Sequence, residues 1–184
     1  MLHRNLLGAR DLIGRSLAEV RLTQAVQRLE HLLVSEFIDE LAPAATLEAN
    51  ARGIRLIVMP VDTGVAIEAD RQVLAAVVGN LLQNAFKFTQ PRTTVTLRVS
   101  ASAERVLIEV QDECLGLPEG NIDALFRPFE QFNADRTGMG LGLAFSRWGV
   151  EANNGRVSAR NLAHTGCVFT VDLPRLPVAA GLVV

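Results

Sequence analysis

The sequence predicts a single α/β domain, because long apolar helical runs are interspersed with short segments rich in β-branched residues. The clearest helix spans about residues 70–88, and two runs with alternating apolar residues, 93–100 and 105–111, follow it directly. The chain has 184 residues, of which 49% are hydrophobic and 21% are charged. That composition supports a folded core of ordinary size with room for an appendage, and it excludes a disordered chain.

The first part of the chain is predicted to be helical. Apolar side chains recur at three- and four-residue steps between residues 6 and 41, a span without proline, and this predicts two helical stretches. The first stretch, residues 6–22, carries charges beside its apolar stripe and is typical of a helix that packs on another helix. A further helical run is expected after Pro43, to about residue 51.

The remaining elements alternate between strands and helices. Strands are predicted, from β-rich runs bounded by turn residues, at residues 54–59, 65–68, 93–100, 105–111, 156–161 and 167–173. Asp70 is a suitable N-cap for the helix that ends near Phe88, and another helix is expected over residues 141–153. The glycine-rich segment 112–142 has no sustained period, and a loop of that length in a compact domain is usually functional.

Charge and cysteine content narrow the classes of function. There are 18 Lys+Arg and 20 Asp+Glu, a formal net charge of −2, so a nucleic-acid-coating function lacks electrostatic support. Cys114 and Cys167 form no CxxC pair and no multi-bridge framework, which favours a reduced cytoplasm. Without a signal peptide or a membrane-spanning run, this piece is expected to be soluble and free of membrane contact, although a longer parent could be membrane-anchored.

A polar stripe on the predicted long helix is the first candidate site. Asn80, Asn84 and Lys87 are spaced i, i+4 and i+7, so they share one narrow face of an otherwise apolar helix. Two carboxamide oxygens one turn apart can ligate Mg²⁺, and a lysine one turn on can offset phosphate charge. The same pattern alone also fits a solvated helix edge.

Two further motifs flank the irregular segment. Asp112 ends an apolar strand and can accept a hydrogen bond from an exocyclic amine such as that of adenine, while Gly116 lets a flat base approach; a turn-initiating aspartate is the alternative. Gly138, Gly140 and Gly142 precede a helix and would turn backbone N–H groups toward a polyphosphate. The dinucleotide pattern GxGxxG and the P-loop pattern are both absent from the sequence.

Between these motifs lies an aromatic segment. Phe126, Phe129 and Phe132 recur at three-residue spacing, which favours a packed helical face over a lid hinge.

The four motifs occur in an order that resembles a known family. NLLQNAFKFT is similar to the N box, DECLGLP to the first glycine box, LFRPFEQF to the F box and GMGLGLAFSR to the second glycine box of the histidine kinase catalytic domain. The resemblance covers residues 34–174. It implies the Bergerat ATP-binding fold, a two-layer α/β sandwich with a mixed sheet on one face and helices on the other, and with ATP between them under a lid. The implied function is that of the ATP-binding catalytic domain of a two-component sensor kinase.

Site residues follow from the resemblance position by position. It implies that Asn84, helped by Asn80, holds Mg²⁺ and that Lys87 meets the phosphates, so these three would carry the chemistry. Phe88, Asp112 and Gly116 would form the base pocket, and residues 120–136 the lid. The triphosphate would be wrapped by Thr137, Gly138, Met139, Gly140, Leu141, Gly142 and Leu143.

The sequence differs from related families at two positions. Gyrase- and MutL-like ATPases have a general-base glutamate where this chain has Asn80, so transfer to a protein nucleophile is favoured over hydrolysis. Cys114 stands where the family usually has a glycine. Because a Cβ disfavours positive φ, we expect either a slightly altered backbone or a thiol that points into the core.

The phosphate-accepting histidine is not evident. None of the histidines His3, His31 and His164 has the surroundings expected of an acceptor. We therefore expect residues 1–33 to hold the second helix of a dimerisation hairpin and a linker, residues 34–177 the catalytic domain, and residues 178–184 a tail.

The partners implied are the hairpin of a homodimeric parent and a response regulator, with no nucleic acid. Three alternatives stay open: a serine-directed anti-sigma-type kinase, an ATP- or GTP-hydrolysing chaperone or topoisomerase module, and a non-catalytic nucleotide-binding module of the same fold. The leading helix argues against the first, and the missing glutamate at Asn80 argues against the second. Cys114 gives some weight to the third, the non-catalytic module.

Overall fold

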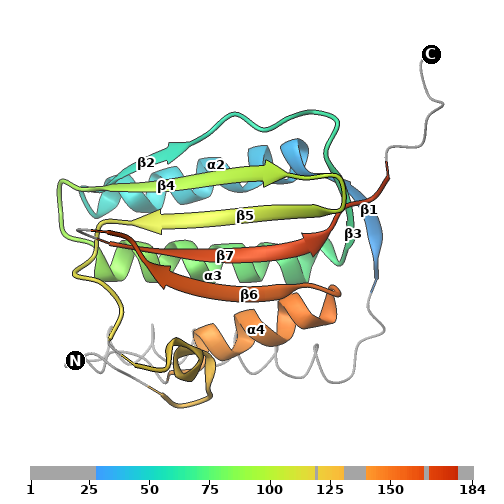
Figure 1. The fold of residues 1–184 in the computed structure, drawn as a ribbon. Coiled ribbons are helices and arrows are strands. Elements are labelled where there is room, and N and C mark those ends of the chain that lie inside the picture. The colour runs from blue at the N-terminus through green and yellow to red at the C-terminus, as the bar shows by residue number, and fades with distance from the viewer. Residues whose placement is uncertain (1–27, 119, 131–139, 164–165, 178–184) are drawn as a thin grey trace, which may run out of the picture.

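The computed structural model describes residues 28–118, 120–130, 140–163 and 166–177. These residues form an α/β sandwich in which a five-stranded mixed sheet is covered on one face by three helices (Figure 1). The two-layer fold expected from the sequence motifs is therefore confirmed. No helix among the described residues is long and apolar enough to cross a bilayer.

The sheet has the strand order β2-β4-β5-β7-β6. Its strands are β2 (Arg55–Val58), β4 (Thr94–Ala101), β5 (Arg105–Asp112), β6 (Arg156–Asn161) and β7 (Cys167–Pro174). β2 pairs with β4 in parallel, and all the other pairs are antiparallel, including the predicted β4–β5 hairpin. In central strand β5, Val106, Ile108 and Val110 are fully buried, as alternation on a sheet with one covered face requires.

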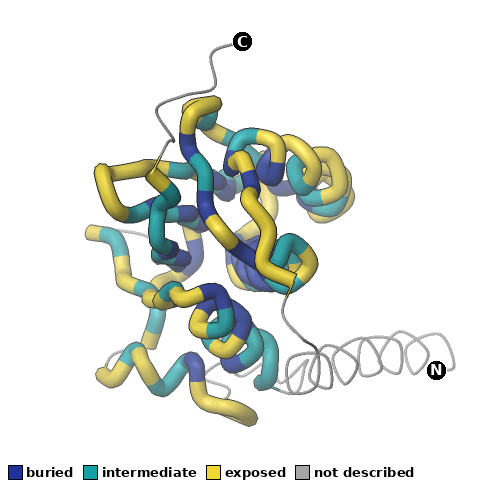
Figure 2. The backbone as a smooth tube through the Cα atoms, turned by 90° about the vertical axis from the view of Figure 1, so that its right-hand side faces the viewer, coloured by how far each residue is buried: buried dark blue, intermediate teal, exposed yellow. Residues whose placement is uncertain are grey.

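The three helices are α2 (Val34–Ala51), α3 (Arg71–Phe88) and α4 (Gly142–Ala152). Asp70 is the N-cap of α3, as predicted, since its Oδ1 accepts hydrogen bonds from the backbone N–H groups of Gln72 at 3.0 Å and Val73 at 3.1 Å. The buried positions of the helices lie on their inner sides, toward the sheet (Figure 2). The core of the domain thus lies between the two layers.

One predicted helical segment is a strand. The periodicity over residues 6–41 predicted helix at residues 30–33, but β1 (Glu30–Leu33) pairs antiparallel with β3 (Ala66–Ala69). Leu32 is fully buried in this small sheet while Leu33 is exposed, so the segment follows a strand pattern. Because the pairing joins residues more than 30 positions apart, helical spacing alone could not reveal it. The predicted helix over residues 6–22 lies outside the described residues.

A helix break was also expected at Pro43, and this prediction is wrong. Helix α2 runs through Pro43, which lies at an exposed position within it. Phe37 and Ile38 before the proline and Ala49 after it are buried. Contacts of both halves with the core offset the lost backbone hydrogen bond.

Helix α4 presents a glycine, without a side chain, to α3 at one point of their contact. A Cβ added at Gly149 of α4 would lie 2.7 Å from Cγ2 of Val77 and 3.1 Å from Cγ1 of Val73, both on α3. Both separations are shorter than an ordinary van der Waals contact. The glycine therefore sets how closely α4 can approach α3.

We predict that Gly149→Ala destabilises the domain, because the added methyl group overlaps stiff valine side chains. The expected cost is about 1–3 kcal/mol, or a fall in Tm of roughly 2–4 °C for each kcal/mol. Thermal unfolding followed by circular dichroism measures it. The matched control is Gly79→Ala in α3, where a Cβ meets nothing within 4 Å and should leave stability unchanged or raise it. Equal melting temperatures for the two variants would contradict the packing argument.

Candidate functional site

Asn80 links the polar stripe of α3 to the start of α4. Its Nδ2 donates a 2.8 Å hydrogen bond to Oγ of Ser146, and that hydroxyl donates to the backbone carbonyl of Gly142 at 3.2 Å. The side chain of Asn80 is half-buried. These bonds orient its carboxamide oxygen toward the N-terminus of α4.

Gly142 permits this approach. A Cβ at this position would lie 2.5 Å from Oδ1 of Asn80, which is too close for two non-bonded atoms. The second glycine box therefore touches the N-box helix at Asn80, as the polar stripe and the glycine loop were expected to do. Sequence analysis missed Ser146, because a single serine inside a helix carries no signal of its own.

The other stripe residues lie toward the C-terminal end of α3. Asn84 is half-buried, and within the described part of the chain its carboxamide makes no hydrogen bond. Nζ of Lys87 lies 5.0 Å from the ring centroid of Phe88, which is 39% exposed. In Figure 1 this end of α3 lies at the same end of the sandwich as the C-terminus of β5 and the start of α4.

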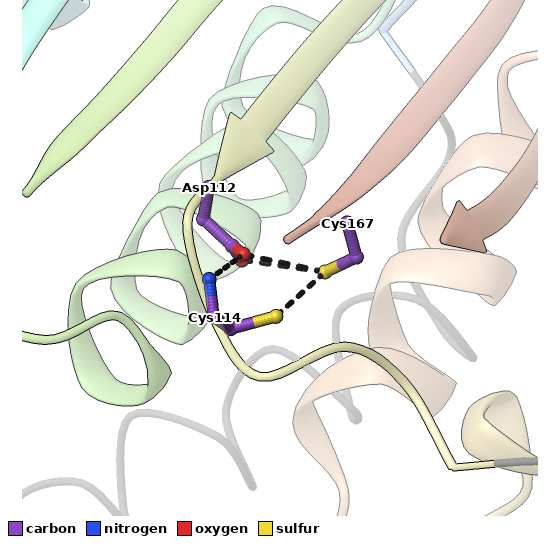
Figure 3. Close-up of side chains that lie close together, drawn as sticks. All are labelled: Asp112, Cys114 and Cys167. Atoms are coloured by element: carbon purple, nitrogen blue, oxygen red, sulfur yellow. Dashed lines mark hydrogen bonds between the residues drawn. The ribbon is translucent and has the colours of Figure 1, made fainter. Parts of the chain in front are cut away.

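Asp112 occupies the last position of β5 and is 2% exposed. Its Oδ1 accepts a hydrogen bond from the backbone N–H of Cys114 at 2.9 Å. Sγ of Cys167 lies 3.4 Å from Oδ2 and 3.5 Å from Oδ1, and the three side chains point toward one another (Figure 3). The Asp112–Cys114 bond is that of an aspartate turn, and a buried carboxylate held beside two thiols also suits ligand recognition.

Cys114, which stands where the family usually has a glycine, does not adopt a positive φ. Its thiol points inward and is buried, which confirms the second of the two expected outcomes. Sγ of Cys114 lies 3.4 Å from Sγ of Cys167 and accepts a 3.3 Å hydrogen bond from the backbone N–H of Gly116.

The pKa values of the two thiols are shifted in opposite directions. The hydrogen bond with Cys167 lowers the pKa of Cys114. The same bond, together with burial and the charge of Asp112, raises the pKa of Cys167 far above its usual range. Any thiolate formed here would therefore be that of Cys114.

Asn161 clamps the loop that follows Asp112. Its Oδ1 accepts from the N–H of Leu117 at 2.6 Å, and its Nδ2 donates to the carbonyl of Leu117 at 3.2 Å. Gly116 lies beside this clamp with φ of +96°, a conformation that side-chain-bearing residues rarely adopt. Sequence analysis missed Asn161 and Cys167, because strand pairing brings them to the loop from more than 40 residues away.

The aromatic segment does not form one packed face. The 3₁₀-helix η1 (Ile122–Phe126) buries Phe126 edge-on against Phe169, with ring centroids 6.3 Å apart. Phe129 is instead 74% exposed with φ of +66°, so the packed-face prediction is wrong for it. Phe132 lies outside the described residues. The N–H of Phe129 donates to the carbonyl of Gly140 at 3.0 Å, so these two residues lie side by side although ten residues separate them in the sequence.

Part of the predicted phosphate loop falls outside the described residues, namely Thr137, Gly138 and Met139. Gly140 has φ of +69°, and Leu141 is the N-cap of α4 without a side-chain hydrogen bond to the helix. Leu141, Gly142 and Leu143 are half-buried. The first N–H groups of α4 thus have no cap from Leu141 and could meet an anion.

A hollow of about 300 Å³ lies elsewhere, lined by residues such as Pro60, Asp62 and Ser100. It is at the other end of β4 from the site, and no predicted site residue lines it. Residues 119 and 131–137 between the glycine boxes, and residues 138–139 at the start of the second box, are outside the described part. The candidate site is therefore defined by its side chains rather than by an enclosed cavity.

The chain matches known proteins over the region of this site. The family model described as histidine kinase-, DNA gyrase B-, and HSP90-like ATPase matches residues 69–177. The circadian input-output histidine kinase CikA of Synechococcus elongatus is 37% identical over 110 residues, which cover 58% of this chain and 15% of CikA. Sensor protein KdpD of Mycobacterium tuberculosis is 38% identical over 116 residues, which cover 61% of this chain and 13% of KdpD. The chain thus spans only a small part of these relatives.

Solved structures share the fold. Histidine kinase ThkA in complex with the response regulator protein TrrA gives a TM-score of 0.78 at 22% identity, over 95% of this chain and 49% of that one. Full-length ShkA in complex with AMPPNP gives a TM-score of 0.71 at 26% identity, over 98% of this chain and 40% of ShkA.

We predict that Asn161→Ala loosens the loop after Asp112 without unfolding the domain. The variant loses both hydrogen bonds to Leu117, each worth about 0.5–1.5 kcal/mol, so exchange of the Leu117 amide proton should accelerate roughly fivefold to 150-fold. Hydrogen exchange measured by NMR tests this. Asn161→Asp keeps the acceptor for the N–H of Leu117 and should preserve most of the protection. Unaltered exchange in Asn161→Ala would show that the clamp does not hold the loop.

Proposed function

The chain belongs to the family of histidine kinase-, DNA gyrase B- and HSP90-like ATPases, as a histidine kinase catalytic domain, and from this we propose a specific site and reaction. The domain binds Mg²⁺–ATP at the end of the sandwich where α3 and β5 terminate. It transfers the γ-phosphate to a histidine on a dimerisation hairpin. The observation that carries the proposal is the contact of Asn80 with Ser146 and Gly142, which joins the amide stripe to the glycine loop.

The amide stripe suits a magnesium ion. Nδ2 of Asn80 donates to Ser146, and its Oδ1 makes no hydrogen bond to a described residue. The Asn84 carboxamide likewise makes none. Uncharged oxygen donors one helical turn apart match a hard cation that retains water and phosphate ligands. When bound, the ion offsets charge on the β- and γ-phosphates.

The base pocket would be formed by Asp112, Gly116 and Phe88. Oδ1 of Asp112 is held by the N–H of Cys114, while Oδ2, among the residues that the structure describes, faces only the weak S–H donor of Cys167. An exocyclic amine could replace that thiol as the donor. Gly116 supplies a turn of positive φ after Cys114, in the loop that follows the carboxylate, and Phe88 offers an exposed ring at the end of α3.

The phosphates would lie between Lys87 and the backbone of residues 137–143. Lysine supplies a positive charge, and the N-terminus of α4 supplies N–H groups that Leu141 does not cap with its side chain. Residues 120–136 would cover the nucleotide as a lid.

The reaction is a transfer rather than a hydrolysis, because the chain has an asparagine at position 80 and no carboxylate there to activate water. Attack by an acceptor imidazole needs chiefly in-line positioning and stabilisation of phosphoryl charge. Asn80, Asn84 and Lys87 would serve those two purposes.

The arrangement of the parent protein is likewise a proposal. Residues 1–33 would be a hairpin helix and linker, 34–177 the catalytic domain and 178–184 a tail. Pairing of β1 with β3 would tie the end of that linker to the catalytic domain. The crystallised complex of ThkA with TrrA supports a response regulator as the next phosphate acceptor. A homodimeric parent working in the cytoplasm, with or without a membrane anchor, fits these parts.

We predict that Asp112→Asn weakens ATP binding at least tenfold, because an amide donor would replace the acceptor facing the adenine amine. Isothermal titration with a non-hydrolysable ATP analogue measures the affinity, and circular dichroism checks folding. The control is Glu113→Gln, which neutralises the adjacent, exposed carboxylate and should bind normally. Equal affinity for the two variants would remove Asp112 from the base pocket.

We predict that Asn84→Ala removes most of the magnesium dependence of ATP binding, since a ligand oxygen is lost. The measurement is a titration with and without Mg²⁺. Gln83→Ala, at an exposed position on the same helix, is the matched control. A magnesium effect as large in Asn84→Ala as in the control would exclude Asn84 as a ligand.

We predict that the 184-residue chain incubated with labelled ATP gains little label, and that adding a complete hairpin with an acceptor histidine yields acid-labile phosphohistidine on the hairpin. The reason is that no histidine here has an acceptor's surroundings. Strong self-labelling on histidine contradicts the absence of an acceptor. Acid-stable phosphoserine would favour a serine-directed kinase, and ATP binding without any transfer a non-catalytic module.

A further inference from the structure

Two thiols and a carboxylate converge at the end of β5. The ligand atoms of Asp112, Cys114 and Cys167 all lie within 4.8 Å of one another, and all three residues are buried. Figure 3 shows the three side chains pointing into the same small space. They are the chain's only two cysteines and the single aspartate among its buried described residues.

The backbone holds this cluster in place. Asp112 and Cys167 are direct partners across β5 and β7, and Cys114 is turned back toward them by the bond from its N–H to Oδ1 of Asp112. Gly166, with φ of +93°, lets β7 begin against the backbone of Asp112, where a Cβ would overlap the carbonyl oxygen. The cluster therefore needs little rearrangement to act as a unit.

The spacing of the donor atoms matches that of a tetrahedral metal. With bonds of about 2.3 Å to sulfur and about 2.1 Å to oxygen, tetrahedral zinc separates two sulfurs by about 3.8 Å and a sulfur from an oxygen by about 3.6 Å. The two sulfurs lie 3.4 Å apart, and Sγ of Cys167 lies 3.4 Å from Oδ2 of Asp112. For these two pairs, shifts of a few tenths of an ångström would reach the tetrahedral spacing, and Sγ of Cys114 lies within 4.8 Å of the carboxylate.

The donor set selects the kind of metal. Two sulfurs favour a thiophilic cation such as Zn²⁺ over Mg²⁺, which prefers oxygen ligands. Three protein ligands leave a fourth coordination position, which water can fill.

We propose that Asp112, Cys114 and Cys167 form a binding site for Zn²⁺ or a similar thiophilic divalent cation. Binding forms two metal–sulfur bonds and one metal–oxygen bond and releases the two thiol protons to solvent. It also withdraws the Asp112 carboxylate from any purine amine. Zinc and ATP should therefore exclude each other; this second part rests on the proposed function, whereas the metal site does not.

The test uses the full 184-residue chain, reduced and then desalted under anaerobic conditions. Zinc is titrated against a chromophoric chelator, and the thiols are counted with Ellman's reagent before and after zinc is added. We expect one zinc per chain and protection of both thiols. Cobalt added in place of zinc should give a thiolate-to-metal charge-transfer band. Because there are two cysteines in the whole chain, the thiol count reports on this site alone.

Matched variants locate the site. Cys114→Ser and Cys167→Ser should each weaken zinc binding at least about tenfold, while Glu113→Gln, next to the cluster, should leave it unchanged. Zinc binding undiminished in either serine variant would overturn the proposal. The proposal would also be overturned if both thiols stayed reactive after zinc is added. It would likewise be overturned if the reduced, metal-free chain already contained a Cys114–Cys167 disulfide. If the serine variants fail to fold, absence of the cobalt band in the unmodified chain overturns it.

A competition experiment separates the metal site from the proposed function. Zinc should raise the apparent Kd for ATP in the unmodified chain and should have a much smaller effect in Cys167→Ser. The variant is the control for chelation of free zinc by ATP, which is the same in both samples. If zinc binds as expected but the affinity for ATP does not change, the metal site stands and Asp112 is not the base-reading group. If ATP binds normally and zinc does not bind, the metal site alone is overturned.

Discussion

The close contact between α3 and α4 is the constraint on which the site depends. Gly142, Ser146 and Gly149 are spaced i, i+4 and i+7, so one face of α4 carries only small side chains. Gly149 meets the valines of α3, while Gly142 and Ser146 meet Asn80 one to two turns further along. The two helices therefore run antiparallel, and the same interface that is apolar at one end becomes polar at the other. The contact between α3 and α4 therefore contributes both to the apolar core and to the position of Asn80 in the candidate site.

This arrangement also explains the direction of the electrostatics. The N-terminus of α4, with its partial positive charge and without a side-chain cap from Leu141, lies at the polar end of the interface. Strand β5 ends at that same end of the sandwich with the buried carboxylate of Asp112 (Figure 1). A ligand with a purine at one end and phosphates at the other would match an acceptor near β5 and donors near α4. The antiparallel packing thus determines the polarity with which such a ligand would lie.

Local patterns predicted the elements whose signals are local. The apolar period of α3, its Asp70 cap and the alternation in β4 and β5 were sufficient, since each depends on neighbours within a few residues. Strand β1 was missed because its partner β3 lies far along the chain, and α2 continues past Pro43 because buried residues on both sides hold it. For the site, motif residues were predictable, but Ser146, Asn161 and Cys167 were not. Each acts through a contact that only tertiary structure creates.

The surroundings of Asp112 show why a thiol is suited to this position. A buried carboxylate needs hydrogen-bond donors in the free protein, yet a strong donor would have to be displaced before a ligand could bind. Here a backbone N–H, from Cys114, orients one oxygen permanently, and the weak S–H donor of Cys167 faces the other. On the proposed function, an incoming amine would exchange a weak hydrogen bond for a stronger one, so little stabilisation would be lost on binding. In the proposed metal site, the same thiol would ligate a soft metal ion together with the carboxylate, whereas an alcohol at position 167 would be a poor ligand for such an ion.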